Sequence, residues 1–161
     1  MTQLRGKDMR NEAGTWVIRI TPEAGTVKTK KYRDVPLHLQ VIELGFVDFV
    51  KRSNSGPLFY RSASENGNKE QAQATSGTIS EWLQGEGLIP EELAPSHSWR
   101  HRFKTLARDH GSAEFVVNSI CSHEGRTEGD NYGDVSIKAK KLVVDMMPRF
   151  EFAPEPVEDP P

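Results

Sequence analysis

Cysteine is almost absent from this sequence: Cys121 is the only one among 161 residues. No disulfide can therefore form within the chain, and a reducing compartment is the natural assumption. The sequence also lacks an apolar run of about 20 residues, the length that a transmembrane helix needs, and it shows no signal-peptide pattern. We therefore expect a soluble, cytoplasmic protein with no membrane partner.

An excess of positive charge is lacking as well. Lys and Arg number 21 against 23 Asp and Glu, which gives a formal net charge of −2. Phosphate-binding domains are usually basic, so the total charge does not by itself favour a nucleic-acid partner. The distribution is uneven, however. Basic residues gather at 28–31, 100–102 and 138–141, and acidic residues gather at 86–92 and in the C-terminal tail.

The chain is long enough for one hydrophobic core, and its 35% hydrophobic content gives no reason to expect a second. We expect residues 1–150 to form a single domain. Residues 151–161 are acidic and rich in proline, a composition that cannot bury enough apolar surface to fold. That tail is expected to be disordered.

Two kinds of periodicity predict an α+β fold. Short β-rich runs at Thr15–Ile20, Thr26–Lys28 and Tyr32–Pro36 are separated by turn residues, which predicts a small three-stranded antiparallel sheet near the N-terminus. After them, apolar residues recur at helical spacing. The expected helices span residues 38–52, 69–85, 97–110, 113–120 and 135–147. The domain should be mostly helical.

The helix expected after Ser96 carries the first candidate functional residues. With Ser96 as N-cap, His97 and Arg100 lie three residues apart on one face of the first turn. Backbone N–H groups at a helix start and a planar guanidinium both favour an anion such as phosphate. An isolated H-x-x-R is nevertheless more often an ordinary solvent-exposed helix start.

The residues elsewhere in the chain change that assessment. His123 follows the next short helix, and Tyr132 comes nine residues later. Near the N-terminus, Lys28 lies in a basic turn before an R-x-V-P-L stretch, Arg33–Leu37. This order, with the spacings from Arg100 to His123 and from His123 to Tyr132, resembles the catalytic domain of the tyrosine recombinase (phage integrase) family.

The resemblance implies DNA integration or site-specific recombination, by strand cleavage and rejoining through a 3′-phosphotyrosine intermediate. Tyr132 would be the nucleophile, and Arg100 would hold a non-bridging phosphate oxygen. His97 and His123 would stabilise the developing charge and help to move protons. Lys28 would protonate the departing 5′-oxygen. This chemistry needs no metal, no cofactor and no small-molecule substrate.

The same resemblance implies DNA as the partner, with self-association on DNA through the C-terminal helix. Three further basic residues are expected to contact DNA, namely Lys30, Lys31 and Arg102. Tyr60 is a second tyrosine to consider as a nucleophile, but its apolar surroundings in the sequence favour a packed aromatic side chain.

One departure from the family's pattern matters. The family carries a first catalytic arginine in a helix before the first strand, and a core-binding domain before that; the sequence contains neither, and Arg5 is in the wrong place for that role. A lost charge-stabilising donor typically costs about 10²–10³ in rate. We therefore expect this chain to be a fragment, weak or inactive alone. The alternative is a non-catalytic DNA-binding or oligomerisation module from a truncated integrase.

Two other classes are weaker interpretations. A type IB topoisomerase uses the same nucleophile, but the short spacing from His123 to Tyr132 favours a recombinase. A metal site would draw on Cys121 and several histidines. His97 and His101 have zinc-ligand spacing, whereas Cys121 and His123 do not.

Overall fold

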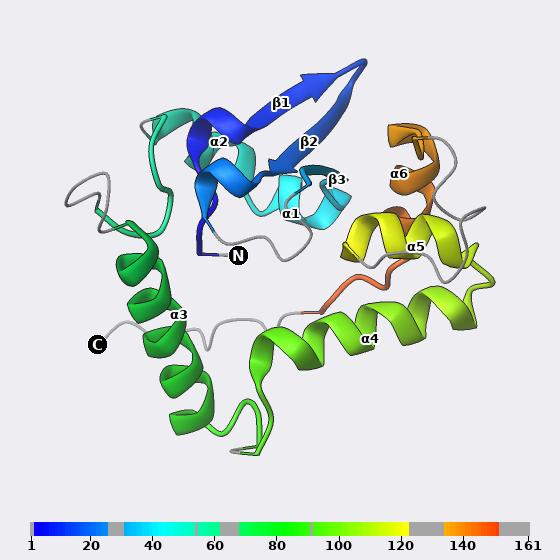
Figure 1. Cartoon of the computed structure of the whole chain (residues 1–161). Helices are drawn as coiled ribbons and strands as arrows, with labels where there is room; N and C mark the ends of the chain where they lie inside the picture. Colours follow the sequence, from blue (N-terminus) through cyan, green and yellow to red (C-terminus); the bar gives the residue numbers. More distant parts are fainter. Residues whose placement is uncertain are drawn as a thin grey trace, which may run out of the picture.

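The computed structural model describes residues 2–25, 31–53, 55–61, 68–90, 92–122 and 134–151. In these residues the protein is α+β, mostly helical with a three-stranded antiparallel sheet near the N-terminus, as the sequence predicts (Figure 1). The strands are β1 (Met9–Glu12), β2 (Thr15–Ile20) and β3 (Arg33–Pro36), and 3₁₀ turns lie at Gly6–Asp8 and Pro22–Ala24. The helices are α1 (Leu39–Glu43), α2 (Phe46–Arg52), α3 (Asn68–Gly85), α4 (Pro95–Asp109), α5 (Glu114–Cys121) and α6 (Ile137–Asp145).

The first strand of the sheet differs from the sequence prediction. β1 pairs with β2 through the turn Ala13-Gly14, where both residues have positive φ, as a two-residue hairpin requires. Hydrophobic periodicity does not predict this strand, because residues Arg10 to Glu12 are polar and the second half of β1 is exposed. Pairing with β2, rather than its own composition, makes it a strand. The segment expected as a strand at 26–28 lies outside the described residues.

β3 is an edge strand, and its outer edge is covered by a lysine. The backbone N–H of Leu37 donates to Trp16 O at 2.8 Å. Since partners alternate along an antiparallel pair, Arg33 and Val35 bond to β2 while Asp34 and Pro36 turn their backbone outward. Pro36 thus loses no ladder bond. The free carbonyl of Asp34 accepts a hydrogen bond from Lys140 Nζ of α6 at 3.2 Å.

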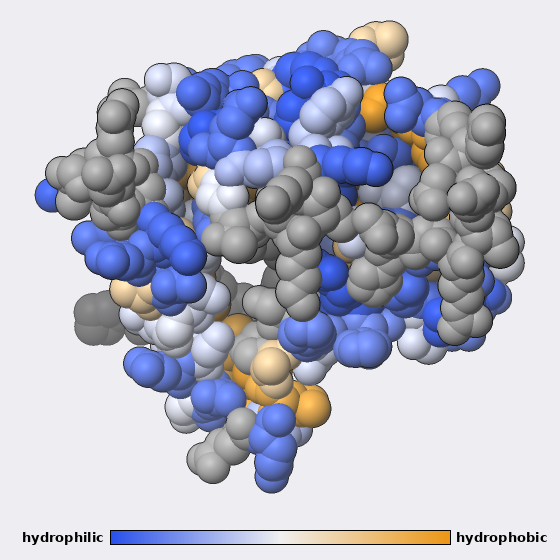
Figure 2. Space-filling view, viewed as in Figure 1, coloured by the Kyte–Doolittle hydropathy of each residue, from blue (hydrophilic) through white to orange (hydrophobic). Residues whose placement is uncertain are grey.

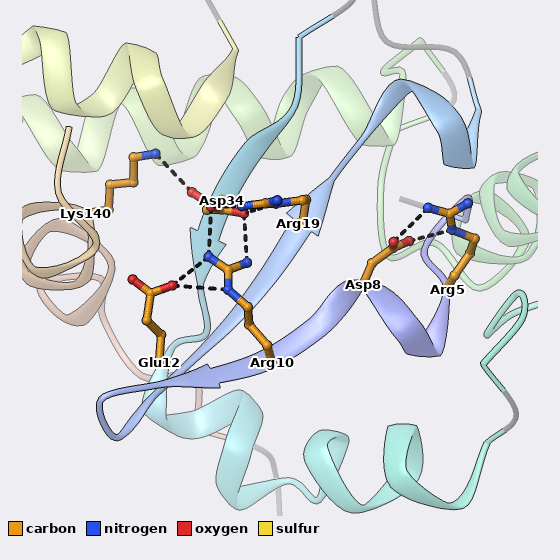
Figure 3. A network of polar contacts seen from close by, with 7 residues as sticks. All are labelled: Arg5, Asp8, Arg10, Glu12, Arg19, Asp34 and Lys140. Carbon is orange, nitrogen blue, oxygen red and sulfur yellow. Dashed lines mark hydrogen bonds and ion pairs between the residues drawn. The ribbon is translucent and has the colours of Figure 1, made fainter. Parts of the chain in front are cut away.

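One face of the sheet holds an ion-pair network centred on Asp34 (Figure 3). Arg10 donates to both carboxylate oxygens of Asp34 at 3.0 and 2.9 Å, and Arg19 does the same at 2.9 Å each. Burial would raise the pKa of Asp34, but the hydrogen bonds from Arg19 and Arg10 outweigh it and lower that pKa. Arg10 also binds Glu12. The three strands are therefore tied together on this face by one carboxylate.

Among the described residues, most buried apolar side chains fall into two clusters. The first, under the sheet, is built on Ile18, Leu37 and Val47, with side chains from α1 and α2 around it. The second joins the helices at the other end: Ala107, Val116, Val117, Ile120, Cys121, Val143 and Val144. Val35 of β3 packs against this helical core. The strand β3 therefore connects the sheet to α4, α5 and α6.

The helix expected over 38–52 is two helices. Gly45 lies between α1 and α2 with φ of +82°, in the left-handed region that breaks a helix. An added Cβ at Gly45 would meet nothing within 4 Å, so only the backbone conformation opposes a larger residue there.

Two glycine substitutions should therefore have opposite effects. Gly45→Ala should lower the free energy of unfolding by about 1 kcal/mol, because an L-residue is strained at positive φ. Gly77→Ala, in the exposed interior of α3 and equally free of contacts, should raise it by about 0.5–1 kcal/mol. Urea unfolding curves of both variants measure this. Equal shifts in the two variants would contradict the account of the break at Gly45.

Several large apolar side chains of α3 and α4 are exposed rather than buried. Among the residues of α3 whose burial the structure describes, 69–85, only Ala72 is buried; it lies near Thr2, whose hydroxyl donates to Ala72 O at 2.9 Å. Trp82 and Trp99 are 57% and 51% exposed. In Figure 1, α3 stands away from the sheet. The surface in Figure 2 is mostly hydrophilic, with hydrophobic colour over the junction of α3 and α4.

The chain after α6 returns to the start of α1, where polar contacts hold it. Buried Gln40 of α1 donates to Phe150 O at 2.6 Å and accepts from Phe150 N at 2.9 Å. His38 Nε2 donates to Met147 O at 3.2 Å, and Trp99 of α4 meets the ring of Phe150 edge-on. Residues 147–150 thus link α1 to α4. Of the tail expected to be disordered, 151–161, residues 152–161 lie outside the described residues.

Candidate functional site

The helix that carries His97 and Arg100 begins earlier than the sequence predicted. Its N-cap is Ala94, with Pro95 in the first turn, and no side chain caps it. Proline is favoured there because the missing N–H would be unpaired anyway. Ser96 is therefore not the cap. His97 remains in the first turn, but Arg100 lies in the second. For binding an anion, the guanidinium of Arg100 therefore matters more than the backbone N–H groups at the helix start.

The predicted site residues divide into two groups. Four lie in the described part of the chain, and all four are exposed: Lys31, His97, Arg100 and Arg102. His97 and Arg100 lie near one edge of α4, and the ring of His97 lies 6.2 Å from that of His101, centroid to centroid. The other four predicted residues, Lys28, Lys30, His123 and Tyr132, lie outside the described residues.

Arg100 is an electrostatic neighbour of a second arginine that the sequence analysis did not assign to the site. Arg33, at the start of β3, is partly buried, and its Nε is buried without a hydrogen-bond partner among the described residues. Burial, and then the nearby positive charge of Arg100, lower the pKa of Arg33. The buried thiol of Cys121 lies among the same groups. Burial raises its pKa, and Arg100, Lys104 and Arg33 act against that rise.

Two lysines extend this positive region. Lys104, one turn after Arg100 on α4, donates to Asn118 Oδ1 of α5 at 3.0 Å. Lys140 is only 8% exposed, and burial lowers its pKa. Asp34 and Asp134 lie close enough to oppose that shift, while Arg33 adds to it. Positive charge from β3, α4 and α6 therefore gathers near the place where the strand meets the helices. We call Arg33, Arg100, Lys104 and Lys140 the cationic cluster.

The sequence contains one signal that points to Arg33. Residues 33 and 35 share a face of a strand, and Val35 is an obvious core residue, so a charged residue at 33 must face the same interior. By contrast, Arg5 is occupied: its guanidinium binds Asp8 at 2.7 Å through two nitrogens (Figure 3). This contact supports leaving Arg5 out of the site.

Neither a metal centre nor a membrane span is found in the part of the chain that the structure describes. Within it, no three His, Cys, Asp or Glu side chains come together as metal ligands. No described helix combines the length and the apolar character that crossing a bilayer requires. His123, which belongs to the metal alternative, lies outside these residues.

Comparisons with protein-family models, with curated proteins and with solved structures found no match.

Proposed function

We propose that this chain is part of a tyrosine recombinase catalytic domain, which binds a DNA phosphodiester and cleaves and rejoins the strand through Tyr132. The observation that carries the proposal is the order of Lys28, His97, Arg100, His123 and Tyr132 in the sequence. Support from the structure is electrostatic: Arg100 is exposed beside the partly buried Arg33. Two guanidinium groups in one cationic cluster suit a phosphate.

The chemistry follows from the residue types. The phenol of tyrosine has a pKa near ~10 and needs a path for its proton before it attacks phosphorus at neutral pH. In the proposed mechanism the oxygen of Tyr132 forms a bond to phosphorus while the bond to the 5′-oxygen breaks. Arg100, His97 and His123 stabilise the negative charge on the phosphorane, and Lys28 supplies the proton to the leaving oxygen. The phosphotyrosine conserves the bond for religation.

The proposal includes the partners and the location that the sequence analysis expects. DNA is the partner, Lys30, Lys31 and Arg102 contact its backbone, and copies of the chain associate on it through the C-terminal helix. The proposed location is the cytoplasm. Lys31 and Arg102 are both exposed, which a contact with DNA backbone requires.

Covalent trapping tests the proposal directly. The full chain is incubated with nicked duplexes of randomised sequence, from which a cleaved end diffuses away, and the products are separated on a denaturing gel. We expect a low yield of protein–DNA adduct, absent from Tyr132→Phe because phenylalanine has no nucleophilic oxygen. Tyr60→Phe is the matched control and should leave the yield unchanged.

The other outcomes separate the alternatives. An adduct that survives Tyr132→Phe would place the nucleophile elsewhere. Salt-sensitive retention of DNA on a native gel without any adduct would favour the non-catalytic DNA-binding module. No adduct and no retention would overturn both functions.

A further inference from the structure

Arg33 has a place in the fold that its neighbours in sequence do not share. Asp34 turns its carboxylate to the face of the sheet where Arg10 and Arg19 occupy both of its oxygens. Arg33 and Val35 lie on the opposite face, since side chains alternate along a strand. Val35 packs against the helical core. The side chain of Arg33 therefore enters the region between β3 and the helices, and its nearest acidic neighbour in sequence is turned away and already bound.

The guanidinium of Arg33 is poorly compensated there. Within the described residues, its Nε is buried without a hydrogen-bond partner, and Arg33 makes no salt bridge. Its electrostatic neighbours are Arg100, a like charge, and the thiol of Cys121. A buried donor without a partner and two adjacent like charges both cost stability. An anion bound beside these groups would compensate both costs.

We propose that Arg33 is a second phosphate-binding residue of the site, which donates from its guanidinium to the same DNA phosphate that Arg100 holds. This inference rests on the proposed function, because it takes the anion to be a DNA phosphodiester. Two planar guanidinium groups from β3 and α4 can reach different oxygens of one tetrahedral phosphate. Lys104 and Lys140 add positive charge around them without competing for the ligand, since each donates to a protein oxygen.

The arrangement is pre-formed. Arg33 is held by the ladder bonds of β3 to β2, and the Asp34 network fixes the strand from its other face. Lys140 covers the outer edge of the same strand. The guanidinium of Arg33 therefore needs little ordering when the phosphate binds. The repulsion between the two cations is overcome during folding and does not have to be overcome again on binding.

The test compares Arg33→Gln with Arg52→Gln, a matched loss of one exposed arginine at the end of α2. Binding of the full chain to a fluorescent DNA duplex is measured by anisotropy at several salt concentrations, beside thermal unfolding without DNA. Arg33→Gln should weaken binding by about tenfold or more, the worth of a charge-assisted hydrogen bond. It should also reduce the salt slope by about one phosphate contact. Arg52→Gln should change neither.

Thermal unfolding distinguishes a ligand-binding role from a structural one. Without DNA, the melting temperature of Arg33→Gln should equal or exceed that of the parent, because a poorly compensated charge has been removed. A clear fall in the melting temperature would overturn the inference. Arg33→Lys provides a second comparison: it should keep the salt slope, since the charge remains, but bind DNA more weakly, since the planar fork is lost.

Failure of this inference and failure of the proposed function give different results. If Arg100→Gln weakens DNA binding while Arg33→Gln and Arg33→Lys bind as the parent does, Arg33 has no part in the site and the proposed function stands. If the parent does not bind DNA, both fall. If inorganic phosphate raises the melting temperature of the parent but not of Arg33→Gln, and DNA does not bind, the site takes a free anion and the assignment to DNA is overturned.

Discussion

Replacing Asp34 by alanine is expected to lower the free energy of unfolding by about 2–3 kcal/mol. The carboxylate is 12% exposed and accepts four hydrogen bonds from Arg10 and Arg19. Its removal leaves Arg19 without its carboxylate partner and Arg10 with Glu12 alone, and breaking a buried pair costs more than forming it gains. Arg10 and Arg19 are 35% and 42% exposed, so water solvates both guanidinium groups in part and reduces the loss of stability. Urea unfolding measures the change.

A surface pair provides the control. Asp48 and Lys51 on α2 are 3.9 Å apart, and their side chains are 70% and 58% exposed. Asp48→Ala should therefore change the free energy of unfolding by about 0.5 kcal/mol or less, as exposed ion pairs do. Similar losses from the two aspartates would mean that the network around Asp34 is no stronger than a solvent-exposed ion pair.

The Asp34 network should also make stability depend on pH. Hydrogen bonds from the two arginines hold the pKa of Asp34 below its ordinary value in the folded state, so the unfolded state binds the proton first as the pH falls. The stabilisation is present above the unfolded pKa of about 4 and decreases below it. Thermal unfolding of the parent and of Asp34→Asn at a series of pH values should show their difference shrinking on acidification.

Replacing Arg100 by glutamine should have the largest effect on activity. In the proposed reaction its guanidinium meets charge that develops on the phosphorane, and the loss of one such donor costs about 10²–10³ in rate. The yield of covalent adduct per unit time should fall by that factor. The melting temperature should not fall, because Arg100 is exposed and its close charged neighbour is Arg33, a like charge.

Arg108→Gln is the matched control for Arg100→Gln. Arg108 is an exposed arginine in the last turn of the same helix, so its loss removes the same net charge at the other end of α4. The rate of adduct formation should be unchanged in this variant. An equal decrease in both variants would show that total charge, and not the position of Arg100, governs the reaction.

Local pattern was sufficient for much of the fold. Alternation in Thr15–Ile20 predicted β2, and helical spacing predicted α3, α4, α5 and α6 within a few residues. The strand β1 was missed because Arg10 and Glu12 resemble a polar loop until they meet Asp34 and one another. Gly45 was missed as a helix break because the apolar spacing continues across it. In both places a tertiary contact or a backbone conformation decides the structure, and neither produces a periodic pattern of apolar residues in the sequence.

The sequence by itself determined the class of the fold and placed His97 and Arg100 on one edge of a helix, because spacing along a helix fixes which side chains share a face. It also supplies the motif on which the proposed function rests. Only the tertiary structure decided that Arg33 lies beside Arg100, that Lys140 covers the edge of β3, and that Trp82 and Trp99 remain exposed. These placements depend on how β3 packs against α4, α5 and α6. Such contacts join segments that are distant in sequence, and a local sequence pattern does not predict them.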